Sequence, residues 1–260
     1  MNVRLDRWRM DGQTALVTGG SKGIGFACAR ELAALGADLL LVARDGNRLE
    51  AACAELTEEF PGVEARALAA DLTREEDRLA VFDWIADLDA PLSALVNNVG
   101  GHQPQSALDC DDDHVRSLLE LNLLSAFAMC RLAHPHLLAR PTAAIVNIGS
   151  VSGIRHVRAS AGEGMAKAAL HQLTRDLASE WAGDGIRVNA VAPWYVRTQR
   201  SEAALADADT LDEVQERTPL GRIGEAEEIA TVAAFLCLPA ASYVTGQVVA
   251  VDGGLLALGL

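Results

Sequence analysis

The sequence predicts an α/β fold, a single-domain doubly wound (Rossmann-like) parallel sheet of about seven strands with helices on both faces. From residue 14 to residue 251, short apolar segments alternate with segments of helical periodicity, which is the order of repeated βα units. The apolar segments lack strict alternation, as expected for strands buried on both faces. No linker, repeat or low-complexity stretch divides the sequence. We therefore expect one domain over residues 1–260.

Seven apolar segments are the predicted strands, at residues 15–18, 39–43, 65–69, 94–97, 144–148, 187–191 and 247–251. The predicted helices lie between them, at residues 24–35, 46–59, 74–87, 112–138, 161–182 and 225–238. Residues 1–12 are predicted to be a polar lead-in, with Trp8 and Met10 packed on the domain edge. Residues 194–222 are the least regular segment, and long loops in compact domains are often functional, so we expect a substrate lid there.

Composition and charge narrow the classes of partner. A net charge of −14 and a pI near 4.8 argue against nucleic acid and anionic membrane surfaces. No apolar stretch reaches the roughly 18 residues of a membrane span, and the arginines near the N-terminus precede no apolar run of the kind found in a secretory signal. Five cysteines without CxxC spacing favour a reducing compartment, so we expect a cytoplasmic protein. We expect no metal site.

Residues 18–25 read TGGSKGIG between the first predicted strand and the first predicted helix. A helix start offers unpaired N–H groups and the positive end of the helix dipole, and glycines let an anion approach closely, so this turn suits a phosphate. Its spacing is not the usual dinucleotide-fold spacing. It resembles the TGxxxGxG turn of the short-chain dehydrogenase/reductase family. The predicted cofactor-binding residues in the turn are Gly19, Ser21, Lys22, Gly23, Ile24 and Gly25.

Two cations favour NADP(H) as the cofactor. Lys22 lies inside the turn, and Arg44 follows the second predicted strand, where a fold that selects NAD carries an acidic residue. Asp45 is the opposing feature, because its carboxylate could turn toward the ribose. The family resemblance implies that Asp71 and Leu72 contact the adenine ring. The sequence also predicts Asp71 as the N-cap of the following helix.

The resemblance implies further contacts to the cofactor. Asn98 and Gly100, in NNVG after the fourth predicted strand, are similar to the family's NNAG and are expected near the cofactor. Val196 and Thr198, in VNAVAPWYVRT, match positions that contact the carboxamide. Lys167 matches the lysine that binds the nicotinamide ribose.

The same resemblance implies an Asn–Ser–Tyr–Lys tetrad. Asn122 matches the asparagine that holds a water beside the lysine, Ser150 matches the serine that bonds the substrate oxygen, and Lys167 completes the set. Ser152 is the competing serine, although the family spacing of 13 residues before the tyrosine position favours Ser150. The tyrosine position, four residues before the lysine, is Glu163 in this chain.

Glu163 is the main departure from the family pattern. The two tyrosines, Tyr195 and Tyr243, cannot take its register. A phenol has a free pKa of about 10, which a neighbouring cation lowers toward neutral pH, whereas a carboxyl group begins near about 4.3 and a cation lowers it further. The chemistry at this position therefore differs from that of a tyrosine.

Three interpretations of Glu163 stay open. An ionised carboxylate stabilises a cation, which suits hydride transfer from NADPH to the C=N bond of a small cyclic imine or iminium substrate. An apolar pocket can raise a carboxyl pKa, which would let Glu163 act as the acid in ketone reduction. The third interpretation is a loss of activity, natural or engineered, in a protein that still binds NADPH.

The substrate side resembles the tropinone-reductase-like branch, which implies small cyclic, often amine-bearing substrates. His102, His156 and Trp194 are candidate pocket walls by family position, with a surface histidine as the alternative for both histidines. Six acidic residues in segment 200–217 predict either a solvated lid helix or an acidic mouth that attracts amines. The family forms dimers and tetramers, so a homodimer or homotetramer is expected. The segments implied in such contacts are residues 112–138, 161–182 and 255–260.

Overall fold

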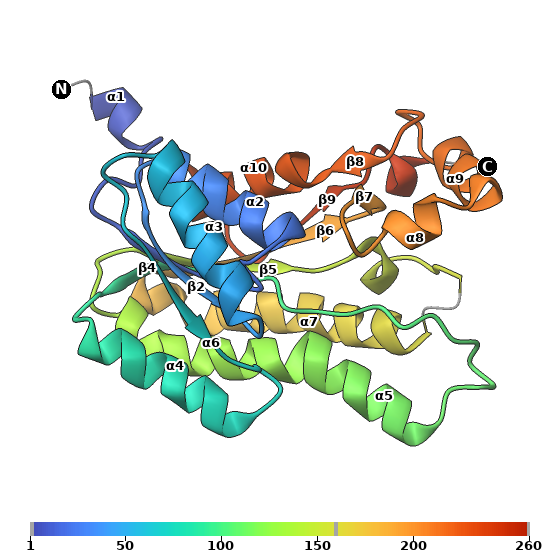
Figure 1. Ribbon diagram of the computed structural model, residues 1–260, viewed down its shortest axis with the longest axis horizontal. Helices are drawn as coiled ribbons and strands as arrows, with labels where there is room; N and C mark the ends of the chain where they lie inside the picture. The colour runs from blue at the N-terminus through green and yellow to red at the C-terminus, as the bar shows by residue number, and fades with distance from the viewer. Residues whose placement is uncertain (1–2, 159–160, 259–260) are drawn as a thin grey trace.

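A parallel sheet forms the centre of the molecule (Figure 1). The computed structural model describes residues 3–158 and 161–258, so the first two residues of the lead-in and the last two of the C-terminal segment lie outside it. The strands of the sheet are β1 (Thr14–Thr18), β2 (Asp38–Ala43), β3 (Ala65–Ala69), β4 (Leu92–Asn97), β5 (Ala143–Ile148), β6 (Ile186–Pro193) and β9 (Val248–Val251). Within the described ranges these seven strands pair in parallel in the order β3-β2-β1-β4-β5-β6-β9. The predicted doubly wound sheet is confirmed.

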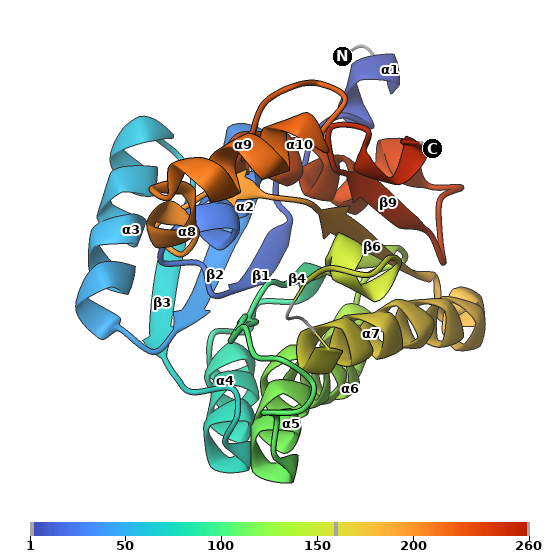
Figure 2. The same ribbon diagram turned by 90° about the vertical axis from the view of Figure 1, so that its right-hand side faces the viewer.

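Helices cover both faces of the sheet (Figure 2). One face carries α2 (Gly23–Ala34), α3 (Gly46–Glu59) and α10 (Ala226–Cys237). The other carries α4 (Glu75–Asp87), α5 (Asp112–Leu119), α6 (Ser125–Leu137) and α7 (Ala161–Glu180). In the described part of the chain, no helix is both long and apolar enough to cross a membrane.

Two aliphatic cores lie on the two faces. Successive residues of a strand point to opposite faces, so Ala15 and Val17 of β1 pack with α2 and α10 whereas Leu16 packs with α4 and α6. All three side chains are fully buried. Burial on both faces explains why the strands read as continuous apolar runs.

The predicted helices are present with small differences at their ends. The helices that the sequence did not predict are short. The lead-in contains α1 (Val3–Asp6), and Met10 is fully buried, not at the edge as expected. Trp8 stacks on Phe235 at 5.9 Å between ring centroids. The helix predicted over residues 112–138 is interrupted by a π-helical turn at Glu120–Leu124.

The segment 194–222 contains more regular structure than expected. It holds the two-residue strand β7 (Val196–Arg197) and the helices α8 (Glu202–Leu205) and α9 (Ala208–Glu216). Strand β7 pairs in parallel with β8 (Gly224–Glu225), which leads into α10. The β7–β8 pair therefore brings the two ends of segment 194–222 together at the start of α10.

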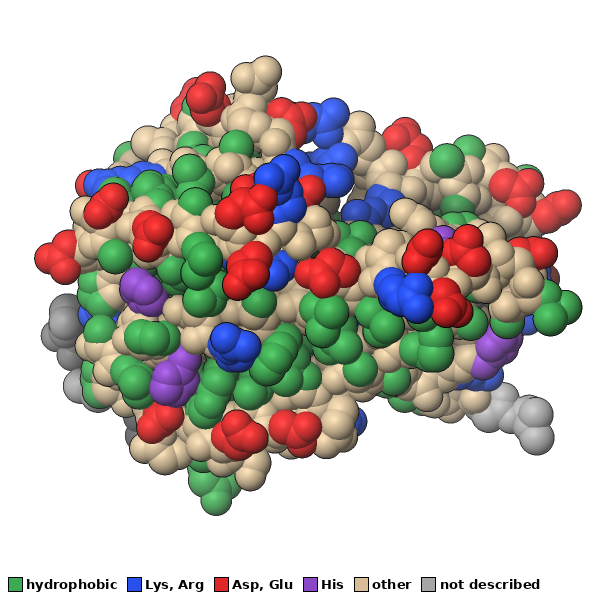
Figure 3. Space-filling view, turned by 90° about the horizontal axis from the view of Figure 1, so that it is seen from below, with side chains coloured by type: hydrophobic (Ala, Val, Ile, Leu, Met, Phe, Trp, Pro, Cys, Tyr) green, Lys and Arg blue, Asp and Glu red, His purple; other side chains and the backbone are tan. Residues whose placement is uncertain are grey.

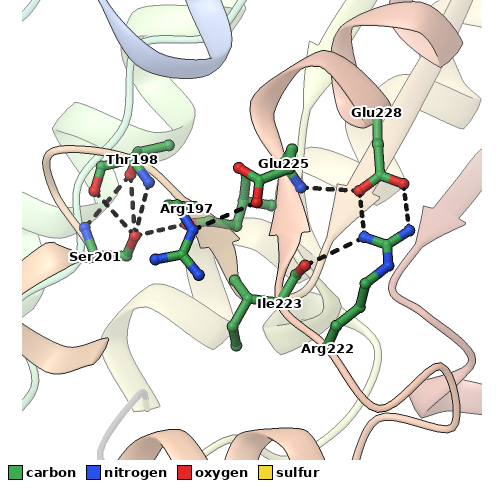
Figure 4. A network of polar contacts seen from close by, with 8 residues as sticks. Arg197, Thr198, Ser201, Arg222, Ile223, Glu225 and Glu228 are labelled. Carbon is green, nitrogen blue, oxygen red and sulfur yellow. Dashed lines mark hydrogen bonds and ion pairs between the residues drawn. The ribbon is translucent and has the colours of Figure 1, made fainter. Parts of the chain in front are cut away.

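Polar contacts hold this attachment together (Figure 4). Arg222 donates two hydrogen bonds of 2.7 Å to the carboxylate of Glu228. That carboxylate also accepts a bond from the backbone N–H of Glu225 at 2.9 Å, and the two interactions lower the pKa of Glu228 to about 2. At the other end, the hydroxyl of Ser201 donates to the carbonyl of Val196 at 2.6 Å. The bonds to Glu228 hold the end of segment 194–222 against α10, and the bond of Ser201 holds the turn after β7.

Candidate active site

The glycine turn between β1 and α2 has the backbone that a bound phosphate requires. Gly19 and Gly23 have positive φ values of +64° and +56°. A Cβ on Gly25 would overlap the carbonyl oxygen of Gly19 and lie 2.5 Å from the amide nitrogen of Asn98. Helix α2 begins at Gly23, and none of the described side chains caps its N-terminus. The turn therefore presents backbone N–H groups to an anion without side chains in the way.

Asn98 ties the turn to the neighbouring strand. Its backbone N–H donates to the hydroxyl of Thr18 at 2.9 Å, and its side-chain amide donates to the carbonyls of Thr18 and Gly19 at 3.1 and 3.3 Å. Asn98 and the glycine turn thus form one hydrogen-bonded unit at the carboxyl ends of β1 and β4. Ligands of doubly wound sheets bind at this edge.

Two cations meet beside the turn. Lys22 and Arg48 both donate to the side-chain oxygen of Gln199, at 3.2 and 3.1 Å. Asp45 caps α3 by accepting the backbone N–H of Arg48 at 3.2 Å, so its carboxylate is occupied at the helix start. Arg44 is exposed at the end of β2. Sequence reasoning missed Arg48, although its position one helical turn after Arg44 was the available signal.

Asp71 forms a local turn after β3. Its carboxylate accepts bonds from the backbone and the hydroxyl of Thr73, at 3.1 and 2.8 Å. The expected N-cap role is wrong, because Arg74 occupies the N-cap of α4 and Asp71 lies too far before it. Burial acts to raise the pKa of Asp71, but the bonds from Thr73 and two nearby arginines outweigh it, so the pKa is lowered. Leu72 is buried in the core.

Asn122 lies in the π-helical turn, a type of distortion that is frequent at functional sites. Its side chain accepts from the N–H of Gly101 at 2.9 Å and donates to the carbonyl of Gly101 at 3.0 Å. A Cβ on Gly100 would lie 2.8 Å from the Asn122 oxygen and 3.2 Å from the Lys167 nitrogen. The structure therefore brings Asn122, Gly100 and Lys167 together and fixes the loop that follows β4.

Ser150 and Ser152 act on each other. Ser150 caps a short 3-10 helix (Val151–Gly153), and its hydroxyl oxygen accepts both the N–H and the hydroxyl of Ser152, at 3.1 and 2.9 Å. A hydroxyl has two acceptor positions and one hydrogen. Because Ser152 donates to both acceptor positions, the hydroxyl hydrogen of Ser150 can point to a further acceptor.

Lys167 is buried on α7, one helical turn beyond Glu163. Its amine donates to the carbonyl of Ile148 at 2.8 Å. Burial lowers the pKa of Lys167 to about 8 against the opposing charge of Glu163, and Arg200 adds to the lowering. The pKa of the Lys167 amine is therefore much closer to neutral pH than that of an exposed lysine.

His171 lies one turn further along α7 and was missed by sequence reasoning. It is buried against the serine loop, so that a Cβ on Gly149 would overlap its Nε2 atom. Burial, with the charges of Lys167 and Arg175, lowers the pKa of His171 to about 4, which keeps the ring neutral. The spacing of four residues from Lys167 was the signal that could have placed it behind the site.

Glu163 lies in the first turn of α7 and pairs with His102 from the loop after β4. The contact joins the carboxylate to Nδ1 of the ring. The Glu163 side chain is 14% exposed and the His102 side chain 37% exposed. Burial, then the carboxylates of Glu213 and Glu163, raise the pKa of Tyr195. The phenol of Tyr195 is therefore close enough to Glu163 for the two groups to interact electrostatically. His102 was expected only as a pocket wall.

The three expected pocket walls lie in different places. His156 is exposed and lines a cavity of about 530 Å³ together with Ser152 and residues 105–107. Trp194 instead donates its indole N–H to the hydroxyl of Thr218 at 3.2 Å and lines a separate cavity of about 90 Å³. Neither His102 nor Trp194 is among the described residues that line the larger cavity.

The acidic residues of the lid take part in local structure. Asp207 caps α9 by accepting the N–H of Thr210 at 3.0 Å. Glu213 pairs with Arg158 and Arg217, both at 3.0 Å. Asp207 and Glu213 are thus both engaged in local contacts of this segment.

Comparison with known proteins agrees with this arrangement. A family model described as enoyl-(acyl carrier protein) reductase matches residues 19–256. One tropinone reductase homolog of Arabidopsis thaliana is 42% identical over 250 residues, covering 96% of this chain and 95% of the relative. Another is 41% identical over 248 residues, covering 95% and 94%.

Solved structures give the same result. A gluconate 5-dehydrogenase from Burkholderia cenocepacia, in complex with NADP and tartrate, is 32% identical with a TM-score of 0.93 and covers 98% of this chain and 100% of that one. The family match, the full-length relatives and the shared fold confirm the resemblance drawn from the glycine turn. The chain belongs to the short-chain dehydrogenase/reductase family and is a tropinone-reductase-like, NAD(P)-dependent oxidoreductase.

Proposed function

We propose that this protein transfers a hydride from NADPH to the C=N bond of a small cyclic imine or iminium compound. The observation that carries the proposal is the carboxylate of Glu163, paired with His102, at the position where the family has a phenol. A carboxylate in a partly buried site stabilises a cationic substrate more strongly than it would in water. An iminium carbon also needs no new proton at the moment when the hydride arrives.

The residues around the glycine turn fit NADP(H). The Gln199 oxygen between Lys22 and Arg48 shows that these two cations can share one oxygen ligand, as a ribose 2′-phosphate would provide. Asp45 is held at the start of α3, which removes the feature that opposed this choice. The bound nicotinamide would supply the hydride. Lys22, Arg44 and Arg48 are the residues proposed to select the phosphorylated ribose.

Other residues of the chain are proposed to hold the rest of the cofactor and the substrate. Backbone N–H groups of the turn take the pyrophosphate. Lys167 takes the nicotinamide ribose, and Val196 and Thr198 take the carboxamide. Ser150 directs its hydrogen toward the substrate heteroatom, which suits the lone pair of a neutral imine. The proposed catalytic set is completed by Asn122, which fixes the loop after β4.

Two observations favour a second candidate, reduction of a cyclic ketone. The hydrogen offered by Ser150 suits a carbonyl oxygen as well as an imine nitrogen. The relatives are tropinone reductase homologs, and the solved neighbour is a gluconate 5-dehydrogenase. In this candidate, either Glu163 or a partner of Glu163 must supply the proton.

The test follows NADPH absorbance with matched panels of cyclic imines and cyclic ketones. We expect turnover of imines with little turnover of ketones, and we expect Glu163→Gln, which keeps the size and removes the charge, to abolish that preference. Equal or better turnover of ketones would replace the first candidate with the second. Tight NADPH binding with no turnover of any compound would mean that the protein is catalytically silent.

The companion variant is Glu163→Tyr, which restores the family residue. If the carboxylate is a specialisation, ketone reduction appears and imine reduction falls. If tyrosine instead creates broad activity in a silent protein, the carboxylate was an inactivating change. NADPH affinity serves as the control, because position 163 lies outside the residues proposed to bind the phosphates.

We also propose that the protein forms a homodimer or homotetramer through the face of α4, α5 and α6. Hydrophobic side chains gather along this face (Figure 3). Leu79 on α4 and Leu124 in the π-helical turn are 47% and 45% exposed, and Arg131 lies over the ring of Phe127 at 5.6 Å. Light scattering of Leu124→Glu should give a smaller assembly than the unchanged protein, and an unchanged mass would contradict this interface.

A further inference from the structure

We propose that His102 is the catalytic residue that donates the proton to the substrate, and that Glu163 positions its ring in place of the missing tyrosine. The proposal rests on the proposed function, reduction of a C=N or C=O bond, and assigns the proton that a neutral imine or a ketone requires. The tropinone-like family pattern supplies a tyrosine for this step, which this chain lacks at position 163.

The first step is the contact between Glu163 and His102. In this proposal Glu163 is ionised, and because a carboxylate only accepts hydrogen bonds, Nδ1 of His102 carries the hydrogen of the pair. The second ring nitrogen, Nε2, then lies on the opposite side of the ring. A glutamate side chain is shorter than a tyrosine side chain, so the carboxylate stops short of the place that a phenol hydroxyl would reach. The ring of His102, bound to the carboxylate, places a second acid–base group beyond it.

The second step is the support of the loop that carries His102. Asn122 binds both the N–H and the carbonyl of Gly101, the residue directly before His102. Gly100 lies against Asn122 and Lys167 so closely that a Cβ would meet both. Asn122 therefore holds the backbone of Gly101, directly before His102, and Glu163 holds the imidazole ring itself. In this chain Asn122 is a positioning residue for His102.

The third step concerns the surrounding charges. The charge of Glu163 acts to raise the pKa of Lys167 on the same helix and the pKa of Tyr195 in segment 194–222. Arg200 acts on Lys167 from the lid, and His171 lies behind Lys167 in neutral form.

Two more charged groups reach the site from outside. Glu213 and Arg158 act on Tyr195 and pair with each other at 3.0 Å. Lys167 is buried whereas the His102 side chain is 37% exposed, so the imidazole is the group that can exchange its proton with water.

The proton and electron balance is simple. The substrate carbon gains a hydride, with its two electrons, from the nicotinamide. The electron pair of the C=N or C=O double bond stays on nitrogen or oxygen, and that atom gains the proton that leaves Nε2. The ring is left neutral, hydrogen-bonded to Glu163, and takes its next proton from water. For a neutral imine the proton moves first and creates the iminium ion.

The test combines spectroscopy of the cofactor-free protein with turnover. With isotope-labelled histidine, we expect a low-field, slowly exchanging Nδ1–H resonance for His102 that Glu163→Gln removes. His134, which pairs with Asp184 at 2.9 Å on another surface, supplies the matched control. His134→Gln should remove only its own resonance and leave turnover unchanged.

Turnover decides the catalytic role. His102→Gln should lower kcat by about 100-fold or more, the usual effect of losing a general acid, with the NADPH Kd unchanged. If His102→Gln keeps the turnover and pH profile of the unchanged enzyme, His102 is only a hydrogen-bond partner of Glu163 and the inference is overturned while the proposed function stands. If the unchanged enzyme turns over no compound of either panel, the proposed function fails, and the proton-donor role fails with it.

Discussion

The proposed cofactor side and the proposed substrate side of the candidate site are built in different ways. The cofactor side (residues 18–25, Asn98 and Arg48) depends on backbone geometry, where glycines admit close contacts and Asn98 bonds main-chain carbonyls. The substrate side (His102, Ser150 and Glu163) depends on side chains that meet across loops and helix starts. Backbone requirements leave little freedom, whereas side chains can exchange roles. The chain combines the glycine turn that the family resemblance predicts with Glu163 at the position where that resemblance predicts a tyrosine.

The strongest way to break the cofactor side is Gly25→Ala. The added Cβ would overlap the Gly19 carbonyl and approach Asn98 at 2.5 Å, which displaces the turn from its strand. We expect the NADPH Kd to rise by about 100-fold or more, because a misplaced turn loses several phosphate contacts of about 1 kcal/mol each. Fluorescence titration measures this. Gly183→Ala, where a Cβ meets nothing within 4 Å, is the control, and equal effects in both variants would contradict the geometry.

Lys167→Met, between the proposed cofactor and substrate sides, should change the free energy of unfolding and the turnover in opposite directions. The Lys167 pKa falls from 10.5 to about 8 on folding, so below pH 8 the buried charge destabilises the native state by about 3 kcal/mol. The unfolded chain keeps the proton between pH 8 and 10.5, so the free energy of unfolding of the cofactor-free protein should rise with pH in that window.

The methionine variant should lose this rise and should be up to about 3 kcal/mol more stable at pH 7, less about 1 kcal/mol for the lost bond to Ile148. It should also lose turnover. Denaturant unfolding of both proteins across pH gives the comparison. A parallel pH dependence in the two proteins would show that Lys167 is not the group responsible.

Arg48→Gln tests the selectivity of the cofactor side and should have the smallest effect. Removal of one exposed cation should weaken NADPH binding by about 10-fold, or about 1.4 kcal/mol, and leave NADH binding unchanged. Arg66→Gln, which breaks a surface pair with Glu64, is the matched control. Tighter binding of NADH than of NADPH by the unchanged protein would overturn the choice of NADP(H).

The fold was predictable from the sequence because buried parallel strands leave a strong pattern. Strands such as β1, buried on both faces, read as apolar runs between helical segments. The strands β7 and β8 have two residues each, too few for any periodicity. The π-helical turn at Glu120–Leu124 keeps the composition of a helix, so sequence alone does not distinguish it.

The candidate site was predictable only where local sequence defines it. Residues 18–25 carry their geometry in consecutive residues, and Asp45 and Arg48 lie one helical turn apart. The N-cap prediction for Asp71 was wrong because Asp71 forms a turn with Thr73, and α4 begins only after Arg74. The pair of His102 and Glu163 spans 61 positions of the chain, and only the fold brings the two together.

The buried amine on α7 has a practical consequence. Besides its amino terminus, the chain contains two lysines, Lys22 and Lys167, and all its other strongly basic side chains are arginines. Reductive methylation with isotope-labelled formaldehyde would thus label the exposed Lys22 and the amino terminus first, and the buried Lys167 only when the protein opens. The Lys22 reporter would follow the glycine turn, and late labelling of Lys167 would follow opening of the protein around α7. The two lysines therefore separate events at the surface turn from opening of the interior, with no need to introduce a foreign label.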